Sequence, residues 1–440
     1  MSKAKAFELF FKKNNYMKQI FIFIIALLYG CSPVPQKPIS QKPTPPVIDQ
    51  TIVKENKTVI LGIENFLQNH LSLVKGKRVG LVTNPSGVNR QIKSTADLLF
   101  ENPHVNLVAL YAPEHGIRGA IDAGKKVKTE IDPKTRLPIY SLYGKTRKPT
   151  AQMLSGVDLL LIDLQDVGVR SYTFIYTMAK VMEAAAAYNK EVMVLDRPNP
   201  MGGVAVEGNL VQDGYFSFVG MYPIAYRHGM TIGELARLFN SEYKINSRLT
   251  VIPLINWRRE MSWGDTQLPW VPTSPHVPHW TTPLLMAITG MIGELGILST
   301  GVGYTLPFEM IGATWINGEK FANALKRLNL PGVIFRPVYF KPYYGIYKGK
   351  VCQGVQIHVT DVNAFKPFVT SIHLMKTSMM LYPRHNLFAK PSRLKMFNKV
   401  MGSAHILNSL QRGYSVNQIE AAWQNPLNYF KNIRRKYLIY

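Results

Sequence analysis

The stretch VDLLLIDLQDVGVRSYTF (157–174) decides the fold of this chain. Its first part, VDLLLIDL (157–164), is a continuous apolar run, and such runs are typical of strands buried on both faces of a sheet. Polar residues follow directly, and residues 172–190 then have the Ala and Met content and the apolar spacing of a long helix. A strand of this kind followed by a helix is the repeating unit of a parallel α/β sheet.

The same alternation continues on both sides of this stretch. Helices are expected at 90–100 and 231–243, the second with Thr231 as N-cap and Glu234 at the capping-box position. Further strands are expected at 77–84, 105–112, 137–143, 191–196 and 249–255. The sequence therefore predicts an α/β fold, with a Rossmann-like, doubly wound and mostly parallel sheet in a domain over residues 57–304.

The pattern changes in the last third of the chain. Residues 320–330, 364–382 and 403–412 have helical spacing, whereas GVIFRPVYFKP (332–342) and VCQGVQIHVTD (351–361) alternate like strands. These segments predict a smaller α+β domain over residues 305–440. Cys352 lies in the second strand segment and is expected to be a small core residue.

The N-terminus has the composition of an export signal. In MKQIFIFIIALLYGC (17–31) a basic start precedes an apolar run from Ile20 to Leu28, too short to span a bilayer comfortably but suited to a signal-peptide core. The ending is similar to a bacterial lipobox, so residues 1–31 are predicted to be a lipoprotein signal with Cys31 as the lipidated residue. A plain secretory signal with an incidental cysteine is the alternative. Met17 is an alternative start to Met1.

The segment that follows the signal, residues 32–56, is rich in Pro, Lys and Gln. Such a composition cannot build a core and predicts a semi-extended tether. Together the two segments predict an exported protein, held by a lipid anchor in the bacterial cell envelope, on the periplasm-facing membrane leaflet.

The chain is strongly basic, with a formal net charge of +25. This charge favours anionic partners such as cell-wall polymer, acidic glycans, anionic lipid or nucleic acid, although a solvated basic surface without a specific partner explains it equally well. Predicted export and the lack of a basic helix or stripe argue against nucleic acid.

Motifs for cofactors, metals and activated nucleophiles are not found in the sequence. The first strand leads into NPSGVN (84–89) rather than a G-x-G-x-x-G loop, so no cofactor is predicted. HVPH (276–279) has two histidines in a proline-rich loop, and two histidines alone do not make a zinc site. Neither a G-x-S-x-G elbow nor an H-E-x-x-H motif is present.

Polar residues follow one predicted strand after another. In a doubly wound sheet the carboxyl ends of the parallel strands open on one edge, where ligands bind, so these side chains are expected to converge. In chain order they are Asn84; Glu114, His115 and Arg118; Asp163, Gln165, Asp166 and Arg170; and Asp196, Arg197 and Asn199.

Carboxyl groups in this set point to general acid–base chemistry on a polar substrate, and glycosidases commonly use two of them. Glu114 is the preferred general acid, because it follows an apolar strand where partial desolvation would raise its pKa. A helix N-cap or an ion pair with Arg118 is the alternative for Glu114. Asp166 is the leading second carboxylate, with Asp163 and Glu207 behind it, and Asp163 could equally orient a neighbour. His115 is expected to orient rather than react.

Arginines and aromatic residues in these loops suit a carboxylate-bearing sugar. A guanidinium group binds a carboxylate bidentately, and aromatic rings stack on sugars. Because a single arginine is more often part of a structural ion pair, we expect one or two of the four arginines to contact substrate. The candidates are Arg118, Arg170, Arg197 and Arg227, with Tyr172, Tyr222, Tyr226 and His228.

Long, ordered motifs resemble the exo-β-N-acetylmuramidase family of the NamZ type. They are VGLVTNPSGV (79–88), LYAPEHGIRG (110–119), DLQDVGVRSYTFIYTM (163–178), VLDRPNPMGG (194–203), VEGNL (206–210) and YPIAYRHGMTIGELA (222–236). The resemblance implies removal of terminal, non-reducing N-acetylmuramic acid from peptidoglycan fragments, in a cleft between a Rossmann-like and a smaller domain. It also implies that Glu114, in the P-E-H-G motif, is the catalytic glutamate. The lactyl carboxylate of this sugar would suit an arginine clamp.

Some choices stay open at this point. His276 and the stretch GELGILSTGVGYTLPFE (293–309) depart from the family's pattern, which puts the aglycone and sugar preferences in doubt. The second catalytic group could be Asp166 or the substrate's own 2-acetamido group, with Asp166 orienting that amide. A non-catalytic peptidoglycan-binding lipoprotein is the alternative function, and an esterase or amidase a more remote one.

Overall fold

The computed structural model describes residues 58–117, 130–144 and 146–440. The signal, Cys31, the tether and Arg118 lie outside these residues, and Lys57–Tyr440 form one compact unit. Among the residues described, no helix is long and apolar enough to cross a membrane.

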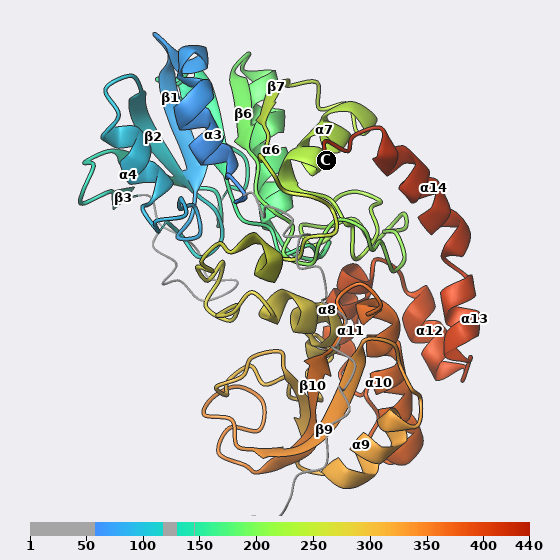
Figure 1. The fold of residues 1–440 in the computed structure, drawn as a ribbon. Helices are drawn as coiled ribbons and strands as arrows, with labels where there is room; N and C mark the ends of the chain where they lie inside the picture. The colour runs from blue at the N-terminus through green and yellow to red at the C-terminus, as the bar shows by residue number, and fades with distance from the viewer. Residues whose placement is uncertain (1–57, 118–129, 145) are drawn as a thin grey trace, which may run out of the picture. The chain divides into compact units, whose positions relative to one another are not determined.

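The large sheet has seven strands, in the order β3-β4-β2-β1-β5-β6-β7 (Figure 1). All neighbouring pairs are parallel except β3 with β4. The bounds are β1 Arg78–Thr83, β2 Asn106–Ala112, β3 Glu130–Ile131, β4 Pro138–Ser141, β5 Leu159–Asp163, β6 Glu191–Leu195 and β7 Arg248–Ile252. The chain builds outward from β1 to β2 and β4, then returns to the other side of β1 to add β5, β6 and β7. This reversal confirms the doubly wound fold and makes β1 and β5 its topological switch point.

Each face of this sheet carries its own hydrophobic core. Leu159 and Leu161 of β5 point into a core built with α3 (Gly62–Asn69) and α4 (Thr95–Phe100). Leu160 and Ile162 point into the opposite core, built with α6 (Phe174–Ala187) and α7 (Ile232–Glu242). Because successive strand residues face opposite sides, a strand between two cores must be apolar throughout, which is what the 157–164 run indicated.

A second, antiparallel sheet of three strands follows in the order β8-β10-β9. Its bounds are β8 Met310–Ala313, β9 Val333–Phe340 and β10 Cys352–Val359. Helix α9 (Gly318–Lys326) packs on β9 and β10, and α10 (Pro367–Leu381) packs on α8 (Thr282–Gly293) and α9. Cys352 is fully buried as a free thiol in this part, which confirms the prediction of a core residue.

The remaining helices are short or follow α10 in sequence. They are η1 Leu71–Val74, α5 Ala151–Leu154, η2 Trp263–Thr266, α11 Pro391–Met401, α12 His405–Gln411, α13 Val416–Ala421 and α14 Gln424–Arg435.

Two differences from the predicted elements have clear physical causes. The helix expected from residue 90 begins at Thr95, because the Ser94 side chain accepts a hydrogen bond from the Asp97 N–H and caps it there. Helix α8 was not predicted at all. Its sequence TPLLMAITGMIG is apolar around most of its circumference, so it lacks the one-sided period that marks a surface helix.

Candidate active site

Glu114 lies directly beyond the carboxyl end of β2, in a tight turn. The Gly116 N–H donates to the Pro113 carbonyl at 3.1 Å, and His115 and Gly116 both have positive φ, at 73° and 75°. A left-handed histidine is uncommon and marks a backbone held by its surroundings. Glu114 and His115 are both buried, and the Thr173 hydroxyl, at the start of α6, donates to Glu114 Oε2 at 2.8 Å.

Tyr143 is a second partner of Glu114 that the sequence reasoning did not select. It follows β4, which is paired with β2, so it reaches the same end of the sheet. Burial first, then the charge of Glu114 and a hydrogen bond to it, raise the pKa of Tyr143 to about 12. Thr173 was missed as well, although both residues lie directly beside predicted element ends.

Asp166 follows β5, and one of its oxygens is fixed by two donors. Oδ2 accepts from the Gly168 N–H at 2.7 Å and lies 3.1 Å from His228 Nε2. The other ring nitrogen, Nδ1, accepts from the Met230 N–H at 3.2 Å, which assigns the proton of a neutral His228 to Nε2. Gly168 has φ +85°, and a Cβ there would come within 2.5 Å of Asn199 Oδ1, so glycine is required.

Buried polar atoms without a partner lie beside this pair. Asp166 Oδ1 and Gln165 Oε1 have no hydrogen-bond partner among the described residues. Gln165 Nε2, by contrast, donates to the Asp166 and Pro198 carbonyls, both at 2.8 Å. Buried acceptors of this kind need a polar ligand or water to satisfy them.

Tyr172 connects the Glu114 and Asp166 sites. It is buried, and burial, aided by the charges of Asp166 and Glu114, raises the pKa of its hydroxyl well above the ordinary value. The side chains of Thr273 and Ser274 lie against the same hydroxyl. The structure therefore gathers Glu114, Asp166, Gln165, Tyr172 and His228 around the ends of β2 and β5.

Asp163 and Arg197 form a buried ion pair between the ends of β5 and β6. Arg197 Nη2 donates to Asp163 Oδ2 and to the Val88 carbonyl, both at 2.8 Å, and Nε donates to Asp163 Oδ1. The Thr95 hydroxyl also donates to Asp163. These contacts satisfy both groups within the protein.

The side chains of Asn84 and Asn199 form hydrogen bonds with nearby loops. Asn84 Nδ2 donates to the Thr273 carbonyl at 3.2 Å, and Asn199 Nδ2 donates to the Met230 carbonyl at 2.9 Å. Asn84 Oδ1 accepts from the Ser86 hydroxyl and Asn199 Oδ1 from the Met201 N–H. Both residues thus shape the loops that border Asp166.

Arg170, Arg227 and Glu207 contact segments that come much later in the chain. Arg170 is fully buried and donates to backbone carbonyls of residues 209, 224, 400 and 401. Arg227 donates to the carbonyls of residues 201, 362 and 365. Glu207 accepts from the Phe368 and Val369 N–H groups in the first turn of α10, at 3.0 and 2.9 Å. Tyr226 is buried against Phe368, with ring centres 5.1 Å apart.

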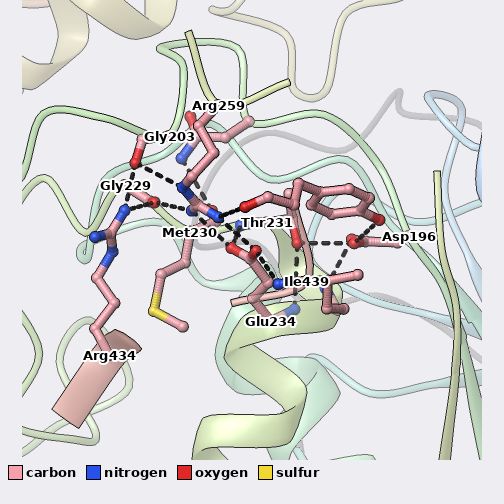
Figure 2. Close-up of polar contacts among 12 residues, drawn as sticks. Asp196, Gly203, Gly229, Met230, Thr231, Glu234, Arg259, Arg434 and Ile439 are labelled. Atoms are coloured by element: carbon pink, nitrogen blue, oxygen red, sulfur yellow. Dashed lines mark hydrogen bonds and ion pairs between the residues drawn. The ribbon is translucent and has the colours of Figure 1, made fainter. Parts of the chain in front are cut away.

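Asp196, at the end of β6, belongs to a polar network that reaches the far end of the chain (Figure 2). It accepts from the Thr231 hydroxyl at 2.7 Å and the Tyr440 hydroxyl at 2.8 Å, as well as from the backbone N–H groups of residues 197 and 233. Burial raises its pKa to about 7. Its contacts are with loop and C-terminal groups, whereas the neighbouring Arg197 guanidinium binds Asp163.

The same network clamps the loops before α7. Arg259 donates to both carboxylate oxygens of Glu234, at 2.6 and 2.9 Å, and Arg434 donates to the carbonyls of Gly203 and Gly229 (Figure 2). The Ile439 N–H donates to Glu234 as well. The loop that carries His228 is therefore tied down by residues of α14 and beyond.

Metal-binding geometry is not found in the part of the chain that the structure describes. No group of three His, Cys, Asp or Glu side chains there could hold an ion. His276 Nε2 lies 2.6 Å from the Tyr344 hydroxyl.

Two buried carboxyl groups lie at the ligand-binding edge of this doubly wound sheet, each held by hydroxyl or N–H donors. Glycoside hydrolases commonly use such a pair of carboxyl groups for catalysis. Comparison with known proteins agrees with this class. The family models for the exo-beta-N-acetylmuramidase NamZ N-terminal and C-terminal parts match residues 79–281 and 284–440. The chain belongs to the NamZ family and is a glycoside hydrolase.

Relatives of known sequence or structure cover most of the chain. The peptidoglycan beta-N-acetylmuramidase NamZ of Bacillus subtilis is 46% identical over 379 residues, which is 86% of this chain and 91% of the relative. Two DUF1343 family proteins from Bacteroides fragilis have solved structures that cover 87% of this chain and 99% of their own. Their TM-scores are 0.83 and 0.72, at 45% and 30% identity.

Proposed function

We propose that this enzyme removes terminal, non-reducing N-acetylmuramic acid from peptidoglycan fragments by carboxyl-based acid catalysis, with Glu114 as the proton donor. The observation that carries the proposal is the setting of Glu114. Its carboxyl group is buried at the end of β2 and contacts two hydroxyl groups, those of Thr173 and Tyr143. The activity of the Bacillus subtilis relative supports the choice of substrate.

Asp166 is proposed as the second catalytic carboxyl group. With Oδ2 held by His228 and Gly168, the partnerless Oδ1 is the atom left to accept a hydrogen bond or a proton. This oxygen would accept a hydrogen bond either from the acetamido N–H of the sugar or from the attacking water. The anomer released first, followed by NMR, distinguishes a retaining reaction assisted by the acetamido group from an inverting reaction with water.

Glu114→Gln tests the assignment of the acid. A good leaving group needs no protonation, so a general-acid variant loses less activity on an activated aryl muramide than on a natural disaccharide. We expect kcat on N-acetylmuramyl-N-acetylglucosamine to fall by about 10²–10⁴-fold, and kcat on the 2,4-dinitrophenyl muramide to fall much less.

Glu130→Gln, on an exposed residue of β3, is the matched control and should retain activity on both substrates. Equal losses on the two substrates in Glu114→Gln would rule out proton donation to the leaving group. A wild-type protein that binds these glycosides and turns over none of them would favour the non-catalytic binding role instead. Release of free monosaccharide, rather than internal cleavage products, distinguishes exo action.

We also propose that the enzyme is exported and held at the cell envelope by a lipid on Cys31, with residues 32–56 as the tether. The lipobox-like sequence and the Pro-rich composition support this proposal. Membrane fractionation of the full-length chain and of Cys31→Ser, in cells fed a labelled fatty acid, tests it.

A further inference from the structure

A cationic side chain that binds the carboxylate of the substrate has to lie near Glu114. In N-acetylmuramic acid the lactyl ether and the glycosidic bond sit on the same sugar ring, so the carboxylate stays within a ring's breadth of the bond that breaks. The guanidinium groups of Arg170 and Arg227 donate to backbone carbonyls, and that of Arg197 donates to Asp163. All three arginines therefore already bind groups within the protein.

Arg147 is a cation in the right place that the strand-end pattern did not indicate. It follows β4 in the same loop as Tyr143, and its side chain is exposed. The guanidinium carbon lies 4.2 Å from the ring centre of Phe218 and 5.5 Å from that of Tyr143. Stacking of this kind holds the planar group in place.

The Tyr143 ring links this cation to the proposed acid. Tyr143 contacts Glu114 through its hydroxyl, while Arg147 lies by its ring. The charges of Glu114 and Arg147 both act on the Tyr143 hydroxyl, in opposite directions. Arg147 and Glu114 are therefore separated by one aromatic side chain.

The positive charge of Arg147 is also available to bind a ligand. Among the residues that the structure describes, no carboxylate forms an ion pair with it. The next residue is different, because Lys148 Nζ lies 3.7 Å from Glu183 Oε2. A stacked guanidinium with unpaired N–H groups is suited to bidentate binding of a carboxylate.

We propose that Arg147 binds the lactyl carboxylate of N-acetylmuramic acid and so makes the enzyme prefer this sugar to N-acetylglucosamine. The inference rests on the proposed function and names the residue that sets its specificity. Phe218 and Tyr143 act as positioning residues, since they hold the guanidinium beside the site.

The test compares two substrates that differ only in charge: an aryl N-acetylmuramide and the same glycoside with the lactyl carboxylate converted to the amide. For wild type we expect kcat/KM to favour the acid. In Arg147→Gln this preference should fall by about 10–100-fold, the usual worth of a charge-assisted pair, mainly through KM. The preference of Arg147→Lys should lie between those of wild type and Arg147→Gln, because an ammonium group keeps the charge but cannot bind a carboxylate bidentately.

Lys148→Gln is the matched control, because it removes one positive charge from the same loop and should leave the preference unchanged. An equal loss on acid and amide in Arg147→Gln would overturn the inference, since the residue would then act through Tyr143 alone. An unchanged preference would overturn it as well. Failure of the proposed function shows separately, as no turnover by wild type. Calorimetric binding of free N-acetylmuramic acid and its amide to wild type and Arg147→Gln would then still decide the contact.

Discussion

Glu114 and Asp166 are both carboxyl groups at strand ends, yet the structure gives them different surroundings. Glu114 contacts the hydroxyls of Thr173 and Tyr143. Asp166 accepts N–H groups from His228 and Gly168 on one oxygen only. The other oxygen of Asp166, Oδ1, has no hydrogen-bond partner among the described residues.

His228 is predicted to act through Asp166. In His228→Ala, Asp166 loses one of the two donors to Oδ2, and we expect kcat to fall by about 10–100-fold, as for other orienting partners, with KM nearly unchanged. His228→Gln keeps an N–H donor at a similar position and should recover part of the loss. Since His228 is fully buried, thermal unfolding of each variant checks that the fold persists. Loss confined to KM, or no recovery in the Gln variant, would contradict this role.

The sequence placed the candidate site residues at strand ends but did not show which groups form hydrogen bonds with each of them. Arg170 and Arg227 were candidates for substrate contact, and Glu207 for the second carboxylate, because they lie in loops beside the site. A buried guanidinium or carboxylate needs several partners, and for each of these residues the partners include backbone groups more than a hundred positions away. Such pairings cannot be read from local sequence. Tyr143 and Thr173 were missed for the same reason.

At the scale of elements, the central strands of the large sheet were predictable because they lie between two cores and are almost wholly apolar. The strands observed at Leu159–Asp163 and Glu191–Leu195 fall within the predicted 157–164 and 191–196. Two elements that lack a detectable period were not predicted. Helix α8 has apolar residues on most sides, and β3 is two residues long, so neither has a period to detect.

Helix α10 depends on Glu207, a side chain from a distant loop. Pro367 at its first turn has no N–H, and a carboxyl oxygen of Glu207 accepts each of the next two N–H groups, which caps the helix. Glu207→Ala leaves these buried donors without a partner, so we expect the free energy of unfolding in urea to fall by about 2–4 kcal/mol. Glu207→Gln still offers one acceptor and should lose less.

The activity of the Glu207 variants separates two roles. A structural role predicts that folded Glu207→Gln retains most of its kcat/KM. A stable variant with a large loss in kcat/KM would instead support a role for Glu207 in the site, as the sequence suggested. Glu191→Gln, which loses a partly exposed pair with Lys77, is the matched control and should change stability little.

At the scale of the whole molecule, two buried acids make stability depend on pH. Burial raises the pKa of Asp196 and of Glu207 to about 7. A carboxyl group whose pKa is raised by folding stabilises the protein below its unfolded pKa, and that stabilisation is lost as the pH rises through the folded value. We expect the unfolding free energy to decrease between about pH 4 and pH 7 from this cause.

Asp196→Asn cannot ionise and tests this dependence directly. The decrease in unfolding free energy from pH 5 to pH 8 should be smaller in Asp196→Asn than in wild type, by on the order of 2 kcal/mol. Asp213→Asn changes an exposed residue and should follow the wild-type curve. Parallel curves for wild type and Asp196→Asn, measured by urea unfolding at each pH, would show that Asp196 does not titrate in this range.

The Tyr440 hydroxyl that donates to Asp196 has a further consequence, for the order in which the protein is made. The two residues are 244 positions apart, so at ordinary ribosomal speeds Tyr440 is synthesised on the order of 10–50 s after Asp196. Throughout that interval the nascent sheet lacks the residues that tie down its loops. For a chain exported through a membrane, as proposed above, this delay would help to keep it unfolded and competent for translocation until Tyr440 has been made.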